Sequence, residues 1–193
     1  MNQKVSAFVF RTRGLYMFVA IAASMVIKSY AGGTTTLLFL LAGLVVIAAV
    51  QCFRTYSASY LWGRQAVAKI EADFLCTAGP YGYIRNPLYL GNFLIGIGLC
   101  IAVNEWYAYA LFIASYAFVY SIVIPYEEKF LQERFGTAYT KYKTQTRRLV
   151  PRLKPYRNGE KVNPNFKAGI LGEIHVPIIL AIISISIYLL YVR

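Results

Sequence analysis

The stretch Thr34–Phe53 reads TTTLLFLLAGLVVIAAVQCF and carries no charged residue. An α-helix of about 20 apolar residues is long enough to cross the roughly 30 Å of hydrocarbon in a bilayer. Similar stretches recur along the 193-residue chain, which is 58% hydrophobic and 15% charged, with a mean hydropathy of +0.50. Because a soluble domain carries about 25% charged residues, we expect an all-α, polytopic integral membrane helical bundle. It should form one membrane domain over residues 1–193.

Five stretches have the composition of transmembrane helices. Asn104 and Glu105 make a tight connection between the third and the fourth, so these two are predicted to form a helical hairpin. The two longest connections, residues 54–87 and 125–167, are polar and basic, and cytoplasmic amphipathic helices are expected there. The predicted spans are residues 14–29, 34–53, 88–103, 106–124 and 168–191.

The formal net charge of +12 is distributed unevenly along the chain. Eleven of the 20 Lys and Arg residues lie between the fourth and fifth predicted spans, and others, among them Arg64 and Lys69, lie between the second and third. With the N-terminus in the cytoplasm, five spans put nearly all basic residues on the cytoplasmic side, as the positive-inside rule requires. Membrane topology therefore explains the charge, and no nucleic-acid partner is expected. We predict a multi-pass protein with a cytoplasmic functional face, in the inner membrane if the source is bacterial.

Cysteine and histidine are too few for several kinds of site. Cys52, Cys76 and Cys100 are widely spaced and form neither a disulfide nor a metal-ligand pattern. His175 is the single histidine, which excludes a His-rich metal site, and its position inside a predicted span argues against a Ser-His-Asp hydrolase. No bound metal is expected.

The first polar stretch with a distinctive pattern is DFLCTAGPYGYIRNPLYLG, residues Asp73–Gly91. Gly79-Pro80 predicts a turn. Asn86 is suited to cap a helix whose first residue is Pro87, so the third span is expected to begin there. A helix N-terminus at the membrane surface presents unpaired N–H groups that suit a carboxylate. The residues alone leave two interpretations open: a capped helix start at the interface, or a ligand site.

The second distinctive stretch, PYEEKFLQERFG over residues 125–136, follows the fourth span. Its apolar residues recur with a helical period, which predicts an amphipathic helix that leaves the span and stops at Gly136. Glu127 and Glu128 lie where the span leaves the hydrocarbon. This carboxylate pair either neutralises nearby Lys and Arg or binds a cationic ligand, and the residues leave both interpretations open.

Taken together, the two stretches resemble the isoprenylcysteine carboxyl methyltransferase family and its bacterial membrane relatives. The resemblance covers about 80 residues, Asp73–Arg152, and neither the first two spans nor the last. Each piece is short, but six pieces occur in the family's order around a helical hairpin. They are Gly79-Pro-Tyr81, Arg85-Asn-Pro-Leu-Tyr89, Glu127-Glu128, Phe135-Gly136, Tyr139 with Tyr142, and Pro151.

Enzymes of this family take a methyl group from S-adenosylmethionine. The resemblance therefore implies a methyltransferase with this cofactor, acting on a lipid-like or prenylated acceptor that comes from the bilayer and is methylated on a carboxylate or thiol. It also implies that residues 54–87 and 125–167 together form the cofactor site. Arg85 and His175 are candidate acceptor contacts, His175 because it is an ionisable residue in a span, and no catalytic residue is assigned. Glu127 would engage the charged amino-acid end of the cofactor. The implied cofactor-binding residues are Leu75, Cys76, Tyr81, Asn86, Pro87, Leu88, Tyr89, Glu127 and Glu128.

The chain departs from the family pattern at two positions. Asn86 stands where the family usually has histidine; an amide still donates a hydrogen bond, but it does not titrate, so acid–base chemistry at this position is excluded. Val123 stands where the prenylcysteine enzymes have an arginine that grips the substrate carboxylate. This second departure puts a prenylated cysteine in doubt as the acceptor.

Two further groups of residues have a structural and a functional interpretation. Glu173 and His175 are ionisable residues near the cytoplasmic end of the last span; they either serve the active site or snorkel and pair with neighbours. Gly91, Gly96 and Gly98 on the third span either open a gap for an acceptor or allow close helix packing.

Three rival functions remain after these considerations. Phospholipid N-methylation uses the same donor and becomes a competitor because the arginine is missing. An NADPH-dependent membrane reductase of the sterol-reductase type has a similar tail, and it would use Arg147, Arg148 and Arg152 for phosphate groups. A non-enzymatic membrane adaptor would keep the shape of the site without its chemistry.

Overall fold

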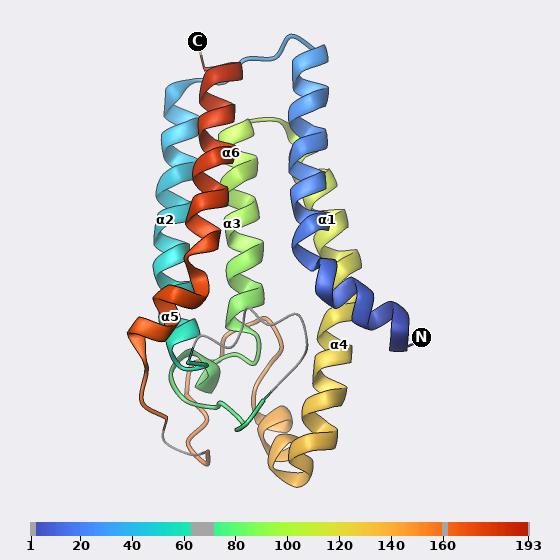
Figure 1. The fold of residues 1–193 in the computed structure, drawn as a ribbon, viewed down its shortest axis with the longest axis vertical. Helices are drawn as coiled ribbons and strands as arrows, with labels where there is room; N and C mark the ends of the chain where they lie inside the picture. Colours follow the sequence, from blue (N-terminus) through green and yellow to red (C-terminus); the bar gives the residue numbers. More distant parts are fainter. Residues whose placement is uncertain (1–2, 63–71, 160–161, 193) are drawn as a thin grey trace. The chain divides into compact units, whose positions relative to one another are not determined.

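The structure, a computed structural model, describes residues 3–62, 72–159 and 162–192. These residues are predominantly helical, which confirms the all-α class (Figure 1). Arg64 and Lys69 lie outside the described residues. Among the residues that the structure describes there is no β-strand, only an isolated bridge between Thr35 and Val192. The helices are α1 (Gln3–Tyr30), α2 (Leu37–Ser59), the 3-10 helix η2 (Gly79–Gly82), α3 (Pro87–Val103), α4 (Trp106–Gln145), α5 (Phe166–Glu173) and α6 (His175–Tyr191).

Three helices, α1, α2 and α4, are long and apolar enough to cross a membrane. The helices α5 and α6 meet at a bend of 41° and together would make a fourth span. Helix α3 is apolar but has 17 residues, at the short end of the range for a spanning helix. A multi-pass membrane protein is therefore the class that these helices support, and the fifth span stays a prediction.

Several helices extend beyond the predicted spans because hydropathy marks only the apolar part of a helix. Helix α1 begins at Gln3 rather than at residue 14, since no glycine or proline interrupts the residues between them. Helix α4 continues through Pro125 to Gln145, where good helix formers such as Glu, Lys and Gln are frequent. The last predicted span, residues 168–191, is divided at Ile174 between α5 and α6.

The chain divides into two compact units, and α2, α3 and α4 contribute residues to both. The first, here called the helical unit, comprises Met1–Gln51, Asn92–Val123 and His175–Arg193. The second, called the loop-rich unit, comprises Cys52–Gly91 and Ile124–Ile174 and contains both distinctive polar stretches of the sequence.

Within the helical unit, small residues let helices approach closely. A Cβ atom added at Gly43 in α2 would collide with the carbonyl oxygen of Gly98 in α3. A Cβ atom added at Gly96 would collide with the ring of Phe112 in α4. Close approach through small residues is a common means of helix association in membranes. The close-packing interpretation of Gly96 and Gly98 is therefore confirmed.

An ion pair between buried Lys28 and half-buried Glu105 joins helix ends in the same unit. The Lys28 ammonium, at the end of α1, is fully buried and donates to the carbonyl oxygen of Val103 at 2.6 Å and to the Glu105 carboxylate at 3.1 Å. Tyr191, at the end of α6, donates from its hydroxyl to the carbonyl oxygen of Met25. These bonds tie α1 to the α3–α4 connection and to α6.

Candidate functional site

A tight turn prepares the start of α3 in the loop-rich unit. Gly79 has φ +55°, a conformation that glycine adopts without strain, and its lack of a side chain leaves room for the Tyr60 ring. Pro80 then lies in η2, and Asn86 directly precedes the first helical residue, Pro87. The Asn86 side chain donates to the carbonyl oxygen of Arg148 at 3.1 Å. Helix α3 thus begins where the Asn-Pro pair indicates, and the Asn86 amide ties this start to a distant segment.

That distant segment, residues 146–156 and here called the strap, is hydrogen-bonded to the backbone of residues 82–86. The bonds bring together two stretches that the sequence analysis assigned to one site. They run from Arg85 N to Arg147 O (2.9 Å), from Asn86 N to Arg148 O (3.2 Å), from Arg152 N to Tyr83 O (3.0 Å) and from Tyr156 N to Gly82 O (2.8 Å).

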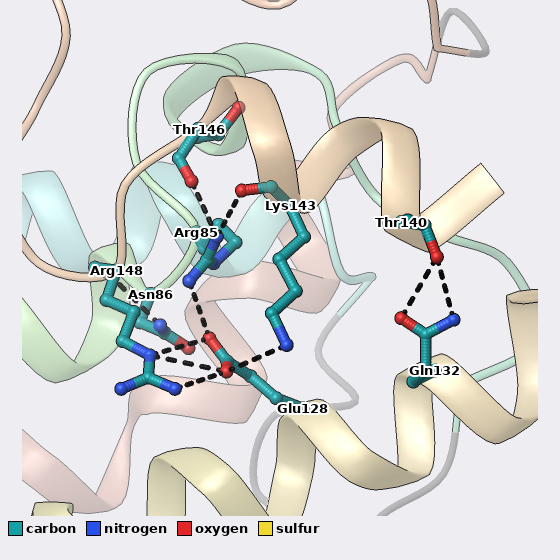
Figure 2. Close-up of polar contacts among 8 residues, drawn as sticks. All are labelled: Arg85, Asn86, Glu128, Gln132, Thr140, Lys143, Thr146 and Arg148. Carbon is teal, nitrogen blue, oxygen red and sulfur yellow. Dashed lines mark hydrogen bonds and ion pairs between the residues drawn. The ribbon is translucent and has the colours of Figure 1, made fainter. Parts of the chain in front are cut away.

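Glu128 is the centre of an ion network between α4, the strap and Arg85 (Figure 2). Arg85 donates to one carboxylate oxygen at 2.8 Å, and Arg148 donates to the other at 2.8 Å. The Lys143 ammonium lies 3.8 Å from the carboxylate. The second guanidinium nitrogen of Arg85 donates to the carbonyl oxygens of Lys143 and Thr146, each at 2.7 Å. Glu128 therefore neutralises neighbouring cations, one of the two interpretations of the carboxylate pair.

The cations determine the charge state of this carboxylate, which lies beyond the apolar part of α4. Burial by itself raises the pKa of Glu128. The hydrogen bond from Arg148 and the charges of Arg85, Arg148 and Lys143 outweigh burial, so the pKa lies below its ordinary value of 4.5. Glu128 is thus an ionised centre of the network at neutral pH.

Glu127, the neighbouring residue, has a different partner. Its carboxylate accepts a hydrogen bond from the hydroxyl of Tyr89, in the first turn of α3, at 2.7 Å. Tyr89 is buried and Glu127 is half-buried. This bond brings one carboxylate of the pair to the start of α3, where the sequence analysis expects the cofactor.

Tyr81 is buried, and its hydroxyl has no hydrogen-bond partner among the described residues. Burial, with the negative charge of Glu127 among the smaller causes, raises the pKa of Tyr81 well above its ordinary value. The hydroxyl is therefore neutral and has a proton to donate. A buried polar group without a partner is uncommon in native proteins and calls for a ligand, a water molecule or a functional role.

Cys76 and Tyr142 are further buried residues around this turn. Burial raises the pKa of the Cys76 thiol from 9.0 to about 12, so it is a neutral group rather than a nucleophilic thiolate. The hydroxyl of Tyr142 donates to the carbonyl oxygen of Tyr81 at 2.7 Å. Both residues support the turn without offering reactive groups.

Hydrogen bonds place several of the predicted site residues, and the other predicted residues are described by their burial and by the unit to which they belong. Arg85 and Asn86 bond the strap or Glu128, and Tyr89 bonds Glu127. His175 is exposed at the start of α6 and belongs to the helical unit, so its predicted acceptor contact stays a prediction. Val123, in the place of the family arginine, is fully buried. The remaining predicted residues, Leu75, Cys76, Tyr81, Pro87 and Leu88, are buried or half-buried in the loop-rich unit.

Arg54, near the end of α2, belongs to no motif of the sequence, and no role was predicted for it. Its guanidinium is buried and paired with Glu173, one of the two ionisable residues of the last predicted span. An arginine at the end of an apolar helix is an ordinary feature of membrane proteins and does not by itself predict a role. The sequence signal for a cationic partner was Glu173, a carboxylate inside a predicted span.

The residues that the structure describes contain no group of three or more His, Cys, Asp or Glu side chains that could hold a metal ion. The arrangement offers instead a carboxylate at Glu127, a phenol proton at Tyr81 and the N-terminus of α3. These groups suit a ligand that carries both a cationic and an anionic end.

Comparison with known proteins gives a family and two relatives. A sequence model of the phospholipid methyltransferase family matches residues 38–138, just over half of the chain. The cobalt-zinc-cadmium resistance protein CzcN of Cupriavidus metallidurans is 31% identical over 120 residues, which are 62% of this chain and 52% of the relative. The nickel-cobalt-cadmium resistance protein NccN of Alcaligenes xylosoxydans xylosoxydans is 30% identical over 105 residues, 54% of this chain and 46% of the relative. The chain spans about half the length of these curated relatives. No solved structure matches it.

Proposed function

Because the chain belongs to the phospholipid methyltransferase family, we propose that it uses S-adenosylmethionine to methylate a lipid-like acceptor in the membrane. Membership of this family supports a membrane methyltransferase; the activity, the donor and the acceptor are all part of the proposal. The proposal is carried by the bond between Tyr89 and Glu127 at the start of α3. Glu127 also acts electrostatically on the buried phenol of Tyr81, which has no hydrogen-bond partner among the described residues.

The residues present fit this donor. S-adenosylmethionine has an ammonium and a carboxylate at its amino-acid end, and Glu127 suits the ammonium while the N-terminus of α3 suits the carboxylate. Tyr81 has a hydroxyl proton without a partner among the described residues, and it would gain one from a bound ligand. Leu75, Cys76, Pro87 and Leu88 would supply apolar walls.

The chain's own residues mainly have to orient and shield the reactants. When bound, the donor would supply a methyl group on a sulfonium, which leaves as the neutral thioether of S-adenosylhomocysteine, so little acid–base chemistry would be required of the protein. Tyr89 holds Glu127 by its hydrogen bond, and the Glu128 network holds α4 against Arg85 and the strap. Alignment of two bound reactants is worth roughly 7–11 kcal/mol of the barrier, and this is the contribution we assign to the site.

The acceptor is proposed to be a lipid-like or prenylated molecule that is methylated on a carboxylate or a thiol. Arg85 and His175 are its proposed contacts. The buried, apolar Val123 leaves no arginine at the family's carboxylate-binding position, and this supports the alternative of a phospholipid amine. Asn86 has no titrating side chain, so an amine acceptor would have to lose its proton to another group.

Calorimetry on the purified protein in detergent tests the donor. Glu127→Gln removes the charge but keeps the size of the side chain, so we expect it to weaken binding of S-adenosylmethionine and S-adenosylhomocysteine about tenfold or more. Glu133→Gln is the matched control, because Glu133 is an exposed residue of the same helix and pairs with Lys129 in an i,i+4 contact. NADPH is titrated in parallel.

The outcomes separate the rival functions. Binding of both adenosyl ligands that is weakened by Glu127→Gln and unchanged in Glu133→Gln supports the proposal. Binding of NADPH alone would indicate a reductase. A folded protein that binds none of the three ligands would be an adaptor, and the proposed function would be wrong.

The acceptor is tested by its chemistry after labelling membranes with methyl-tritiated S-adenosylmethionine. A methyl ester releases volatile methanol in base, whereas N-methyl and S-methyl groups do not. Extraction of base-stable label into the phospholipid fraction would favour the amine alternative, and base-labile label would favour a carboxylate.

The names of the two relatives are those of metal-resistance proteins, and these names are the reason for considering such a role here. We infer that, if the chain has such a role, it acts through methylation of a membrane component. A host that lacks the gene should then regain metal tolerance with the natural chain and not with Glu127→Gln.

A further inference from the structure

Arg54 and Glu173 form a buried, two-pronged ion pair between α2 and α5. The Arg54 Nε donates to one carboxylate oxygen at 2.9 Å, and its Nη2 donates to the other at 3.0 Å. Arg54 is 7% exposed and Glu173 is 2% exposed. Both residues belong to the loop-rich unit.

The same guanidinium also reaches the first turn of α3. Its third nitrogen, Nη1, donates to the carbonyl oxygen of Leu88 at 3.1 Å. Gly91, one turn further along α3, makes room for this side chain: a Cβ atom there would lie 2.5 Å from the Arg54 Cγ. The carbonyl of Leu88 is part of the peptide that carries Tyr89, and Tyr89 holds Glu127. Arg54 is thus connected to the proposed donor site through one peptide group.

Helix α5 is held against α2 by contacts that do not involve the ion pair. Asn165 caps α5 by accepting from the backbone N–H of Ala168, and its own N–H donates to the carbonyl oxygen of Ser59. A Cβ atom at Gly169 would meet the backbone of Ser59 at 2.8 Å, so the two helices touch there. Gly169 and Glu173 lie one turn apart on the same face of α5. The position of Glu173 is therefore set by packing as well as by charge.

A buried ion pair is a costly way to stabilise a fold. Removing two charges from water offsets much of their attraction, and apolar replacements of both partners are often neutral or stabilising. Arg54 does more than pair, however, since its fork geometry lets it bind a carboxylate and a carbonyl at the same time. Bonds to Glu173 and to Leu88 at the same time allow Arg54 to fix the position of the first turn of α3 relative to α5.

We propose that Arg54, held by Glu173, is a positioning residue that sets the first turn of α3 for donor binding. The inference rests on the proposed function and adds to it a residue that lies outside the six motif pieces in the sequence. Arg54 acts through the Leu88–Tyr89 peptide and contacts neither the donor nor the acceptor.

The test compares two ion pairs that are replaced by apolar side chains in the same way. The double variant Arg54→Met/Glu173→Leu replaces the first pair with apolar side chains of similar size. The control, Lys28→Met/Glu105→Leu, removes the ion pair of the helical unit. A third variant, Arg54→Lys, keeps the charge but not the fork. The measurements are calorimetric affinity for S-adenosylhomocysteine, thermal unfolding in detergent, and hydrogen exchange of residues 87–92.

We expect Arg54→Met/Glu173→Leu to fold, to lose exchange protection at residues 87–92 and to bind S-adenosylhomocysteine about tenfold more weakly, the loss expected for a charged hydrogen bond. In turnover, the donor KM should rise more than kcat falls. Arg54→Lys should show the same loss, and the control pair should leave affinity and exchange at residues 87–92 unchanged.

Other results would separate the two proposals. Wild-type affinity and exchange in a folded Arg54→Met/Glu173→Leu protein would overturn the positioning role and leave the proposed function intact. Equal losses in the control variant would show a general effect of stability and would also overturn it. No binding of S-adenosylhomocysteine by the natural protein would overturn the proposed function and, with it, the inference.

Discussion

Glu127 and Glu128 are adjacent in sequence, yet the fold gives them different surroundings. Glu128 is buried among Arg85, Arg148 and Lys143, whereas Glu127 bonds the hydroxyl of Tyr89. On a helix, neighbouring side chains point about 100° apart, so one faces the strap while the other faces α3. The local pattern indicated a carboxylate pair without dividing the two roles, and only the family resemblance singled out Glu127 for a ligand.

The Glu128 network predicts a specific dependence of stability on pH. The pKa of Glu128 in the folded protein is below its ordinary value of 4.5, so its stabilising contribution is complete above about pH 5. The contribution is lost as the pH falls through the folded value. Glu128→Gln should therefore lower the free energy of unfolding by about 2–3 kcal/mol at pH 7. The deficit should shrink as the pH falls below 4.5, when thermal unfolding is followed in detergent.

The control for this prediction is Glu133→Gln, since Glu133 is exposed and its ion pair is expected to add little. A deficit of Glu128→Gln that stayed constant from pH 7 to pH 3 would contradict the role of the ionised carboxylate.

The Tyr81 hydroxyl predicts opposite effects on stability and on binding. Tyr81→Phe removes a buried hydroxyl that has no partner among the described residues, so the free protein should be equally stable or more stable by up to about 1 kcal/mol. Affinity for S-adenosylhomocysteine should fall about three- to tenfold, because a hydrogen bond to the ligand is lost. Thermal unfolding and calorimetry measure the two quantities.

Tyr83→Phe is the matched control, because Tyr83 lies two residues away and is exposed. If Tyr81→Phe destabilised the free protein by several kcal/mol, the hydroxyl would have a partner in solution and this interpretation of the residue would be wrong.

At the scale of single elements, hydropathy and capping residues located the apolar middle of the helices but not all of the helix ends. The Asn86-Pro87 pair indicated the start of α3, and α3 begins at Pro87. A helix was expected past Pro125 as far as Gly136. Its continuation from Gly136 to Gln145 was not expected, because glycine commonly ends a helix. Arg54 and Glu173 are 119 residues apart, and no local pattern encodes such a contact.

Gly136 is the break that the sequence placed in this element, and it has an unusual conformation. It has φ +51° and ψ −122° within α4, and the chain returns to helix after it as far as Gln145. Apart from its chain neighbours and the backbone of its own helix, no atom of the described residues lies within 4 Å of a Cβ added there. The cost of a side chain would therefore be backbone strain. Gly136→Ala should destabilise the protein by about 1–2 kcal/mol.

Gly14→Ala is the control for this prediction, because Gly14 is a regular helical residue of α1 with equally open surroundings. It should leave thermal stability unchanged or raise it by up to about 1 kcal/mol. Similar changes in both variants would argue against strain at Gly136.

At the scale of the whole molecule, the distribution of basic residues predicts the orientation in the membrane. With the N-terminus in the cytoplasm, Tyr30 should face the outside and the strap should face the cytoplasm. Tyr30 is 90% exposed and Leu153 is 99% exposed, so cysteines at either position would be accessible. In a Cys52→Ser background, a membrane-impermeant maleimide should label Tyr30→Cys in intact cells and Leu153→Cys only after lysis.

Buried Cys76 and Cys100 should contribute little background in this assay. Labelling of Leu153→Cys in intact cells would reverse the proposed orientation and would place the donor site on the wrong side for a cytosolic cofactor.

The hydrogen bonds between residues 82–86 and the strap also have a consequence for synthesis. The two partners are separated by about 70 residues of chain, so the turn before α3 leaves the ribosome several seconds before the strap does, at about 5–20 residues per second. During that interval α3 and α4 can enter the membrane while Gly82, Tyr83 and Arg85 still lack their backbone partners. A nascent chain arrested before the strap should thus be inserted in the membrane but unable to bind the donor. Completion of the donor site is then one of the last steps in the synthesis and folding of the protein.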